Sequence, residues 1–201
     1  MSPLTHLLAS WVIAAKTTDN PRDCRLVTLA GILPDVDGLG LVVDLATKAL
    51  GYKGTHLYWR YHHVLLHGAF GAILIAGLLA CFARQRWRVG LLALVVFHLH
   101  LLCDFIGSRG PSPEDLWPIL YFAPFDKNLL WVWRGQWRLD GWQNRVICIS
   151  LFLSALWLAP VWGHSFVGVF NRRVDGVFVA VLRKWRKAWF SRGGEGRAAP
   201  Q

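Results

Sequence analysis

The sequence predicts an all-α fold, a polytopic membrane bundle with about three transmembrane spans, additional N-terminal helices and a C-terminal amphipathic helix. Hydrophobic residues make up 54% of the 201 residues and charged residues only 17%, whereas about a quarter of a soluble domain is charged. Several apolar runs approach the length of about 20 residues that a helix needs to cross a bilayer. The chain also contains twelve tryptophans, a residue type enriched at membrane interfaces.

The net charge of +10 is concentrated beside the apolar runs. From Asn171 onward there are eight Lys or Arg residues against two acids, and the loop Ala83–Val89 adds three arginines. Because positive charge next to apolar spans marks cytoplasmic segments, we expect both segments, and hence the C-terminus, on the cytoplasmic side of a bacterial inner membrane. Binding of nucleic acid by the tail is the less favoured alternative, since basic patches also contact phosphate backbones.

The N-terminal part predicts three helices joined by an acidic turn. Ser2-Pro3 can start the first helix, and His6 falls on its polar face, where the default surrounding is solvent. A second helix follows Asn20-Pro21 and ends before the next proline. The turn Leu33–Gly38 carries Asp35 and Asp37, and the third helix is expected over Leu39–Leu50.

Three spans are expected over Val64–Ala83, Val89–Gly107 and Val146 to about Phe170, the last bent at Pro160. With the arginine loop and the tail both cytoplasmic, three spans place Ser108–Arg145 on the outer side. The domain boundary is expected near residue 170. It separates a membrane-embedded domain over 1–170 from a basic amphipathic helix and a disordered tail over 171–201.

Ionisable side chains gather at the outer ends of the first two spans. His100 and Asp104 are four residues apart, so they share one helix face. His62 and His67 open the first span, and antiparallel spans bring them to the same membrane edge. Because ionisable groups in a spanning helix are costly and usually mark function, we expect one site there.

The ligand types favour a divalent metal. Imidazoles combined with carboxylates suit Zn²⁺, or Mn²⁺ or Fe²⁺, and an open coordination position lowers the pKa of bound water and makes it a nucleophile. Asp35 or Asp37 would complete the metal shell or act as general base. The four cysteines form no C-x-x-C pair, so a cysteine-based zinc site is not expected.

Plainer alternatives remain open at this point. His100 and Asp104 can form a structural ion pair between spans, since polar groups join helices in membranes. His62 can be a solvated interfacial residue, and Asp35 and Asp37 can be ordinary turn acids. His98 points almost opposite His100, so we expect it to pack or form a hydrogen bond away from the site.

Four motifs occur in a fixed order: Thr5-His6, Leu33–Asp37, His62–His67, and His100–Asp104 followed by Trp117-Pro118. Together they resemble the YdjM-like inner-membrane proteins, which are described as metal-dependent hydrolases. The resemblance covers roughly Met1 to Phe125. It departs from the family pattern at His63 and Gly68, where members commonly carry Arg and Ser.

The order of these residues is also distantly similar to the zinc-dependent phospholipase C group, a helical fold acting on phosphodiesters. That similarity implies His6, one acid of the turn, His67, His100 and Asp104 as metal ligands. It implies one or two metals here, because no later H-x-x-x-E motif follows.

The favoured hypothesis is therefore a membrane-bound metal-dependent hydrolase, with the lipid bilayer as partner and a phosphoester or lipid-linked substrate. The alternative is a non-catalytic membrane protein whose tail binds a cytoplasmic protein partner of unknown identity. Metal transport is disfavoured, because the candidate ligands gather at one membrane edge instead of following a path across the bilayer.

Overall fold

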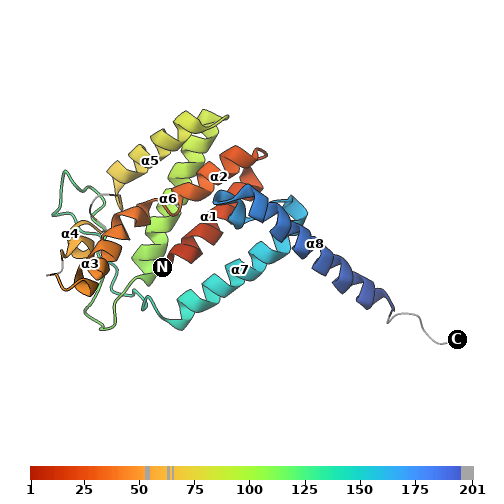
Figure 1. The fold of residues 1–201 in the computed structure, drawn as a ribbon. Coiled ribbons are helices and arrows are strands. Elements are labelled where there is room, and N and C mark those ends of the chain that lie inside the picture. Colours follow the sequence, from red (N-terminus) through yellow and green to blue (C-terminus); the bar gives the residue numbers. More distant parts are fainter. Residues whose placement is uncertain (53–54, 63, 65, 196–201) are drawn as a thin grey trace.

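The structure is a computed structural model that describes residues 1–52, 55–62, 64 and 66–195. Its elements are α1 (Pro3–Thr17), α2 (Pro21–Ala30), the 3₁₀ helix η1 (Pro34–Leu39), α3 (Gly40–Ala49), α4 (Leu57–Tyr61), α5 (Ala69–Phe82), α6 (Arg86–Gly107), α7 (Trp142–Trp162), the 3₁₀ helix η2 (Phe166–Val169) and α8 (Arg172–Glu195) (Figure 1). Within the described residues there is no strand, only two isolated β-bridges. The predicted all-α class is confirmed.

Helix α1 is the centre of the bundle. The Ser2 side chain accepts a hydrogen bond from the Thr5 amide, and proline occupies the first helical turn. The helix packs against α2, α6 and α7, with Leu8 and Trp11 in the hydrophobic core. The expected polar face is buried as well, so the prediction that His6 meets solvent is wrong. The bundle covers α1 on more sides than a single amphipathic stripe would indicate.

Helices α2 and α3 form a bent pair. Asn20 caps α2 with its side chain, and η1 follows it with the acidic turn. The axis bends by 57° between α2 and the continuous stretch Pro34–Ala49, and the pair is apolar enough to form one broken span or a re-entrant segment. Gly51 (φ +79°) ends α3 in the left-handed conformation that favours glycine.

Two helices, α6 and α7, are long and apolar enough to cross a membrane, and the bent pair raises the number of candidates to three. The span predicted over Val64–Ala83 is wrong in extent, because α5 begins only at Ala69 and has 14 residues. At 1.5 Å per residue it is about 21 Å long, short of a bilayer core of about 30 Å. The chain is extended at Gly68, where a Cβ would lie 2.5 Å from the Tyr121 carbonyl oxygen.

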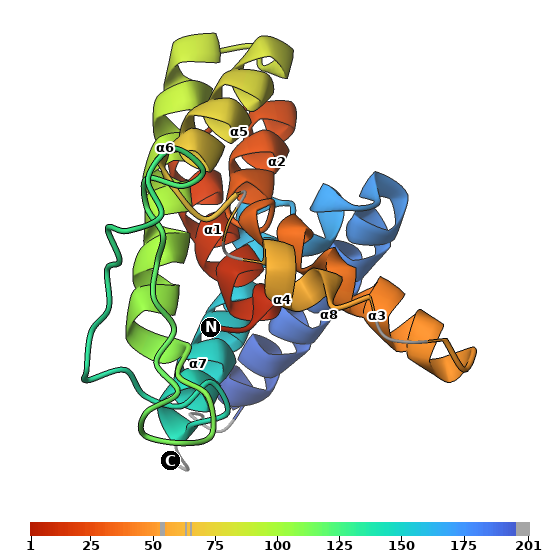
Figure 2. The same ribbon diagram turned by 90° about the vertical axis from the view of Figure 1, so that its left-hand side faces the viewer.

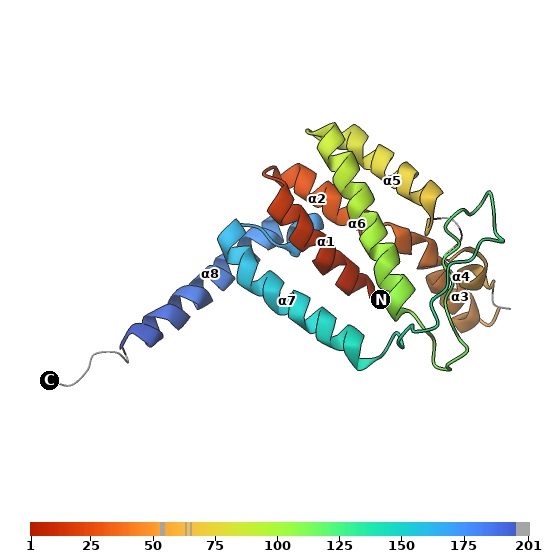
Figure 3. The same cartoon turned by 180° about the vertical axis from the view of Figure 1, so that it is seen from behind.

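The third predicted span is also shorter than expected. Helix α7 ends at Trp162, because Gly163 (φ +79°) adopts the left-handed conformation and donates its amide to the Ala159 carbonyl. Pro160 lies inside the helix, and the bend expected there stays a prediction. Helix α8 then leaves the bundle (Figures 1 and 3) and runs to Glu195. The domain boundary near residue 170 stays a prediction, and the tail over 196–201 lies outside the described residues.

The connection from α6 to α7 lies over the C-terminal end of α6. Bridges pair Arg109 with Arg138 and Ile119 with Trp131. The Asn144 side chain at the start of α7 donates hydrogen bonds to the Gly107 carbonyl at 2.8 Å and to two further carbonyls of the connection. These contacts fix the end of α6 that carries His100 and Asp104.

Candidate metal centre

Helix α6 contributes one wall of the centre. His100 and Asp104 are both buried, and the His100 Nε2 atom lies 3.1 Å from Asp104 Oδ2. This (i, i+4) pair follows from helix geometry, as predicted from the spacing. Both side chains project from the last two turns of α6 towards the segments that precede α3 and α5.

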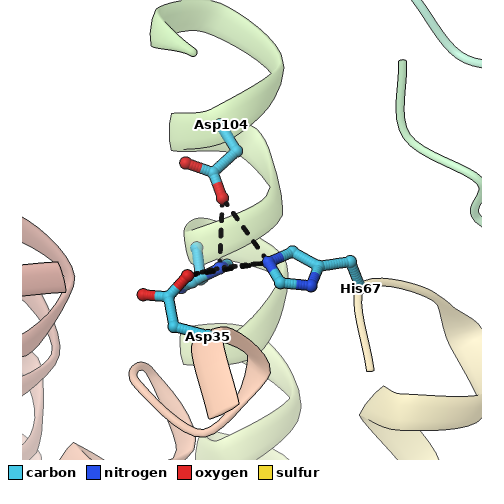
Figure 4. A group of neighbouring side chains, drawn as sticks. Asp35, His67 and Asp104 are labelled. Carbon is cyan, nitrogen blue, oxygen red and sulfur yellow. Dashed lines mark hydrogen bonds and ion pairs between the residues drawn. The ribbon is translucent and has the colours of Figure 1, made fainter. Parts of the chain in front are cut away.

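Two other segments complete the cluster. His67, just before α5, places its Nε2 atom 3.2 Å from His100 Nε2 and 3.8 Å from Asp104 Oδ2. Asp35, in η1, places its Oδ1 atom 3.7 Å from the Nε2 atoms of both histidines. Figure 4 shows Asp35, His67 and Asp104 pointing towards one another. The structure therefore brings together residues 35, 67, 100 and 104 from three separate segments, and their roles as metal ligands stay predictions.

The spacing of the four donor atoms fits a single ion. All four donor atoms lie within 4.8 Å of one another. The five distances between pairs of these atoms given above range from 3.1 to 3.8 Å. Four ligands placed tetrahedrally about 2.1 Å from a zinc ion are separated by about 3.4 Å. The cluster therefore has the dimensions and the donor types of a divalent metal site.

In both His67 and His100, the Nδ1 atom on the side of the ring away from the cluster is bound to a hydrogen-bond acceptor. The His100 Nδ1–H donates to the Gly31 carbonyl at 2.8 Å, and the His67 Nδ1–H donates to Asp37 Oδ2 at 3.0 Å. With Nδ1 protonated, the lone pair of each Nε2 atom faces the cluster. Acceptors behind metal-binding histidines commonly fix the tautomer in this way.

Asp37 lies behind His67, outside the group of four. Its carboxylate accepts hydrogen bonds from His62 Nδ1 at 2.8 Å, from His67 Nδ1 and from the Leu66 amide. Asp37, His62 and His67 form a second group of potential ligands that shares His67 with the first. The predicted roles of Asp37 and His62 as ligands stay predictions, and the geometry adds an orienting role for Asp37.

His6 contacts the cluster from α1. Its Nε2 atom lies 3.2 Å from Asp104 Oδ1, and its ring packs on His100 with centroids 3.8 Å apart. Burial lowers the pKa of His6 more than its hydrogen bond to Asp104 raises it, so burial favours the neutral imidazole. Its role as a ligand stays a prediction.

Two buried polar atoms at the centre lack a hydrogen-bond partner among the described residues, Asp35 Oδ2 and His6 Nδ1. An unpaired buried donor or acceptor costs roughly 1–3 kcal/mol. Such atoms are expected where an ion, a water molecule or a substrate completes the site. This supports the fit of the cluster to a metal centre.

The carboxylates around His67 favour its protonated form. Burial alone would lower the pKa of His67, but hydrogen bonds to Asp35 and Asp37, together with the charge of Asp104, raise it to about 9. A coordinating imidazole must be neutral. A metal ion at Nε2 would therefore take the place of the proton that these carboxylates favour.

Two supporting groups escaped the sequence analysis. The Ser108 hydroxyl donates to Asp104 Oδ1 at 3.0 Å, and the Met1 amino group contacts both residues. Ser108 follows Asp104 by four residues, so the spacing that links His100 to Asp104 would have identified it. No sequence signal marks the Gly31 carbonyl as the acceptor for His100.

A cleft of about 310 Å³ opens onto the centre. Asp35, Asp104 and Ser108 are among its polar lining residues, and Leu39 and Leu41 are among its apolar ones. The remaining lining residues are Met1, Pro3, Gly38, Tyr58, His62, Trp117 and Leu139. A small molecule can therefore reach two of the four candidate ligands from outside the bundle.

Other conspicuous histidines lie elsewhere. His98 is turned away from the cluster, with Nδ1 2.7 Å from the Leu94 carbonyl oxygen and Nε2 2.9 Å from the Tyr121 hydroxyl. The prediction that it forms hydrogen bonds outside the site is confirmed. His63, where the family commonly has Arg, lies outside the described residues.

Comparison with known proteins gives one match. The sequence model of the family described as "YdjM inner membrane protein" matches residues 1–183, which include every residue of the centre. No curated protein and no solved structure matches the chain.

Proposed function

The chain belongs to the YdjM inner membrane protein family, and we propose that it is a membrane-bound metal-dependent hydrolase acting on a phosphoester or lipid-linked substrate. The observation that carries this proposal is the convergence of Asp35, His67, His100 and Asp104 beside a cleft that Asp35 and Asp104 line. Two imidazoles and two carboxylates form a ligand set typical of hydrolytic zinc centres, and Mn²⁺ or Fe²⁺ also accept such ligands.

A divalent ion held by His67, His100 and Asp104, with a further coordination position open to water beside Asp35, would supply Lewis-acid polarisation and an acidified water molecule. The protein's own groups have separable tasks. Asp37 and the Gly31 carbonyl hold His67 and His100 with Nε2 directed into the centre. Ser108 and His6 hold Asp104.

Asp35 is the favoured general base. Its Oδ1 atom lies in the group of four, whereas Oδ2 is buried without a partner among the described residues. An unpaired carboxylate oxygen beside the cleft can accept a proton from an attacking water molecule. Asp37 has both oxygens engaged by His62, His67 and the Leu66 amide, which favours orientation over proton transfer.

We further propose a multi-pass arrangement with the centre at the outer face and the C-terminus in the cytoplasm. The tip between α5 and α6 carries Arg84, Arg86 and Arg88, and α8 is rich in Lys and Arg. Cytoplasmic placement of both agrees with the distribution of positive charge in inner-membrane proteins. Since α6 then runs outward, His100 and Asp104 lie near its outer end.

A non-catalytic role is the alternative, and one observation favours it. Helix α8 projects from the bundle with Trp185 and Trp189 exposed, which suits docking of a cytoplasmic partner. In that case the His/Asp cluster would have only a structural role.

The test is hydrolysis of bis(4-nitrophenyl) phosphate by the detergent-purified protein, before and after chelation and after return of Zn²⁺ or Mn²⁺. The proposal predicts activity that disappears with the metal, returns with it, and is lost in Asp35→Asn while metal binding persists. A metal-loaded protein without activity on this ester or on lipid phosphoesters would favour the non-catalytic alternative.

A further inference from the structure

Helix α3 is unusually exposed for an apolar helix. No residue of α3 is buried, and Val42 and Leu45 expose 62% and 59% of their surface. Figure 2 shows α3 extending away from the bundle, across the direction of α6. An apolar surface of this kind costs free energy in water, so it marks a region that contacts lipid or another apolar partner.

The two sides of α3 differ in chemistry. On the inner side, the Asp44 carboxylate accepts hydrogen bonds from the Leu57 and Tyr58 amides, both at 2.9 Å, and from the Thr55 hydroxyl. At 100° per residue, Val42 lies about 160° around the helix from Asp44. The side facing away from the protein is formed by Val42, Val43, Leu45, Ala46, Ala49 and Leu50.

The bilayer is the occupant that fits this apolar side. The chain belongs to an inner-membrane family, and α6, whose end carries the centre, is long and apolar enough to span the membrane. A helix with one apolar side that lies across a spanning helix, at its end, is placed to rest in the membrane interface. Its apolar side then contacts acyl chains, while Asp44 remains bound to the protein.

The apolar surface continues into the cleft of the metal centre. Leu39, the last residue of η1, and Leu41, in the first turn of α3, line the cleft together with Asp35 and Asp104. Leu39 is also 58% exposed to the outside. Apolar residues where α3 begins and two of the four candidate ligands therefore line the same cleft.

We propose that α3 is a membrane-seated entrance through which an amphiphilic phosphoester passes from the bilayer into the cleft. This inference rests on the proposed hydrolase function. In this proposal the phosphoester lies beside Asp35 and Asp104, and the hydrocarbon chain lies along Leu39 and Leu41. The substrate is thus a lipid that never leaves the membrane, and a water-soluble ester with the same reacting bond is a poor substitute.

The first test is independent of activity. The full-length protein is reconstituted in phosphatidylethanolamine and phosphatidylglycerol vesicles that contain a phosphatidylcholine with a diazirine in its acyl chain. After irradiation, mass spectrometry should find lipid adducts in residues 39–50 as well as in α7, which serves as the lipid-exposed reference. Adducts on α7 without adducts on residues 39–50 would overturn the proposal.

The second test compares 4-nitrophenyl hexadecyl phosphate in mixed micelles with 4-nitrophenyl ethyl phosphate. In the hydrolysis of both esters, water adds to phosphorus and the bond between phosphorus and the aryl oxygen breaks. The products are 4-nitrophenol and an alkyl phosphate. The ratio of kcat/KM values should favour the hexadecyl ester by about ten-fold or more, since burial of even two methylenes supplies that much. Leu41→Gln should reduce this ratio about ten-fold, whereas Val174→Gln, an exposed site on α8, should leave it unchanged.

These outcomes separate the two proposals. If both esters are hydrolysed with equal kcat/KM, the hydrolase function stands and the membrane entrance is wrong. If neither is hydrolysed, the hydrolase function fails for these esters, and the photolabelling still decides whether α3 contacts lipid. Equal metal content in Leu41→Gln and the wild type confirms that the substitution spares the centre.

Discussion

The Nε2 atoms of His67 and His100 face each other at 3.2 Å. Each ring donates its Nδ1–H to an acceptor on its far side, Asp37 for His67 and the Gly31 carbonyl for His100. Two lone pairs at this distance repel unless a cation lies between them. A proton can fill this place, and so can a divalent ion, which would also accept the nearby Asp35 and Asp104 carboxylates as ligands.

The histidines of α6 provide a matched pair of variants. His100→Ala removes a donor atom from the cluster, whereas His98→Ala removes a histidine two residues away whose contacts are with Leu94 and Tyr121. We expect His100→Ala to abolish tight Zn²⁺ binding and His98→Ala to leave it unchanged, as measured by competition with a chromogenic chelator. Equal loss of binding in both variants would show that unfolding of α6, not ligand removal, is responsible.

Substitution of Asp37 tests whether this carboxylate orients His67 as a metal ligand. Asp37→Asn keeps the shape but weakens the hydrogen bond that holds His67. Loss of such partners typically lowers metal affinity 10–100-fold, so a drop within about that range is expected from the same titration. Complete loss of binding would instead make Asp37 a ligand, as the sequence analysis also allowed.

Gly31 is required where α2 meets α1. A Cβ at this position would lie 1.7 Å from Ser10 Oγ and 2.7 Å from Ser10 Cβ, and the Gly31 carbonyl holds His100. We expect Gly31→Ala to lower the free energy of unfolding by about 1–3 kcal/mol, as overpacking typically does. Thermal unfolding in detergent would measure it.

The double variant Ser10→Gly/Gly31→Ala is the matched control, because it removes the side chain that the new methyl group meets. It should recover part of the lost stability. A double variant no more stable than Gly31→Ala would mean that the close approach of Ser10 is not the cause.

The cluster was predictable because its parts follow local rules. The spacing of His100 and Asp104 fixes one face of α6, and antiparallel α5 and α6 bring His67 to the same end. The acidic turn was recognised from its proline, glycine and aspartates. The helix spacing and the turn are local signals, whereas the approach of His67 was inferred from the packing of two helices, and the sequence left open whether Asp35 or Asp37 joins the cluster.

What could not be predicted depends on contacts between distant segments. The late start of α5 follows from the close approach of Gly68 to the Tyr121 carbonyl, and the burial of His6 follows from the helices packed around α1. The different roles proposed for Asp35 and Asp37 depend on which of the two carboxylates accepts the hydrogen bond from His67 Nδ1. Hydropathy and spacing contain none of this information.

Membrane topology is tested by reporter fusions. With the α5–α6 tip and α8 both cytoplasmic, a green fluorescent protein joined to the C-terminus should fluoresce, and alkaline phosphatase joined there should be inactive. A phosphatase inserted between Pro111 and Pro113, in the connection from α6 to α7, should be active. The opposite pattern would place the metal centre on the cytoplasmic face and reverse the proposed orientation.

Elemental analysis of the detergent-purified protein tests the central claim most directly. The wild type should contain about one equivalent of divalent metal per chain, most of it zinc, and Asp104→Ala should contain none while remaining folded by circular dichroism. A wild type without stoichiometric metal, or an Asp104→Ala variant that retains its full metal content, would contradict the assignment of this cluster as a metal centre.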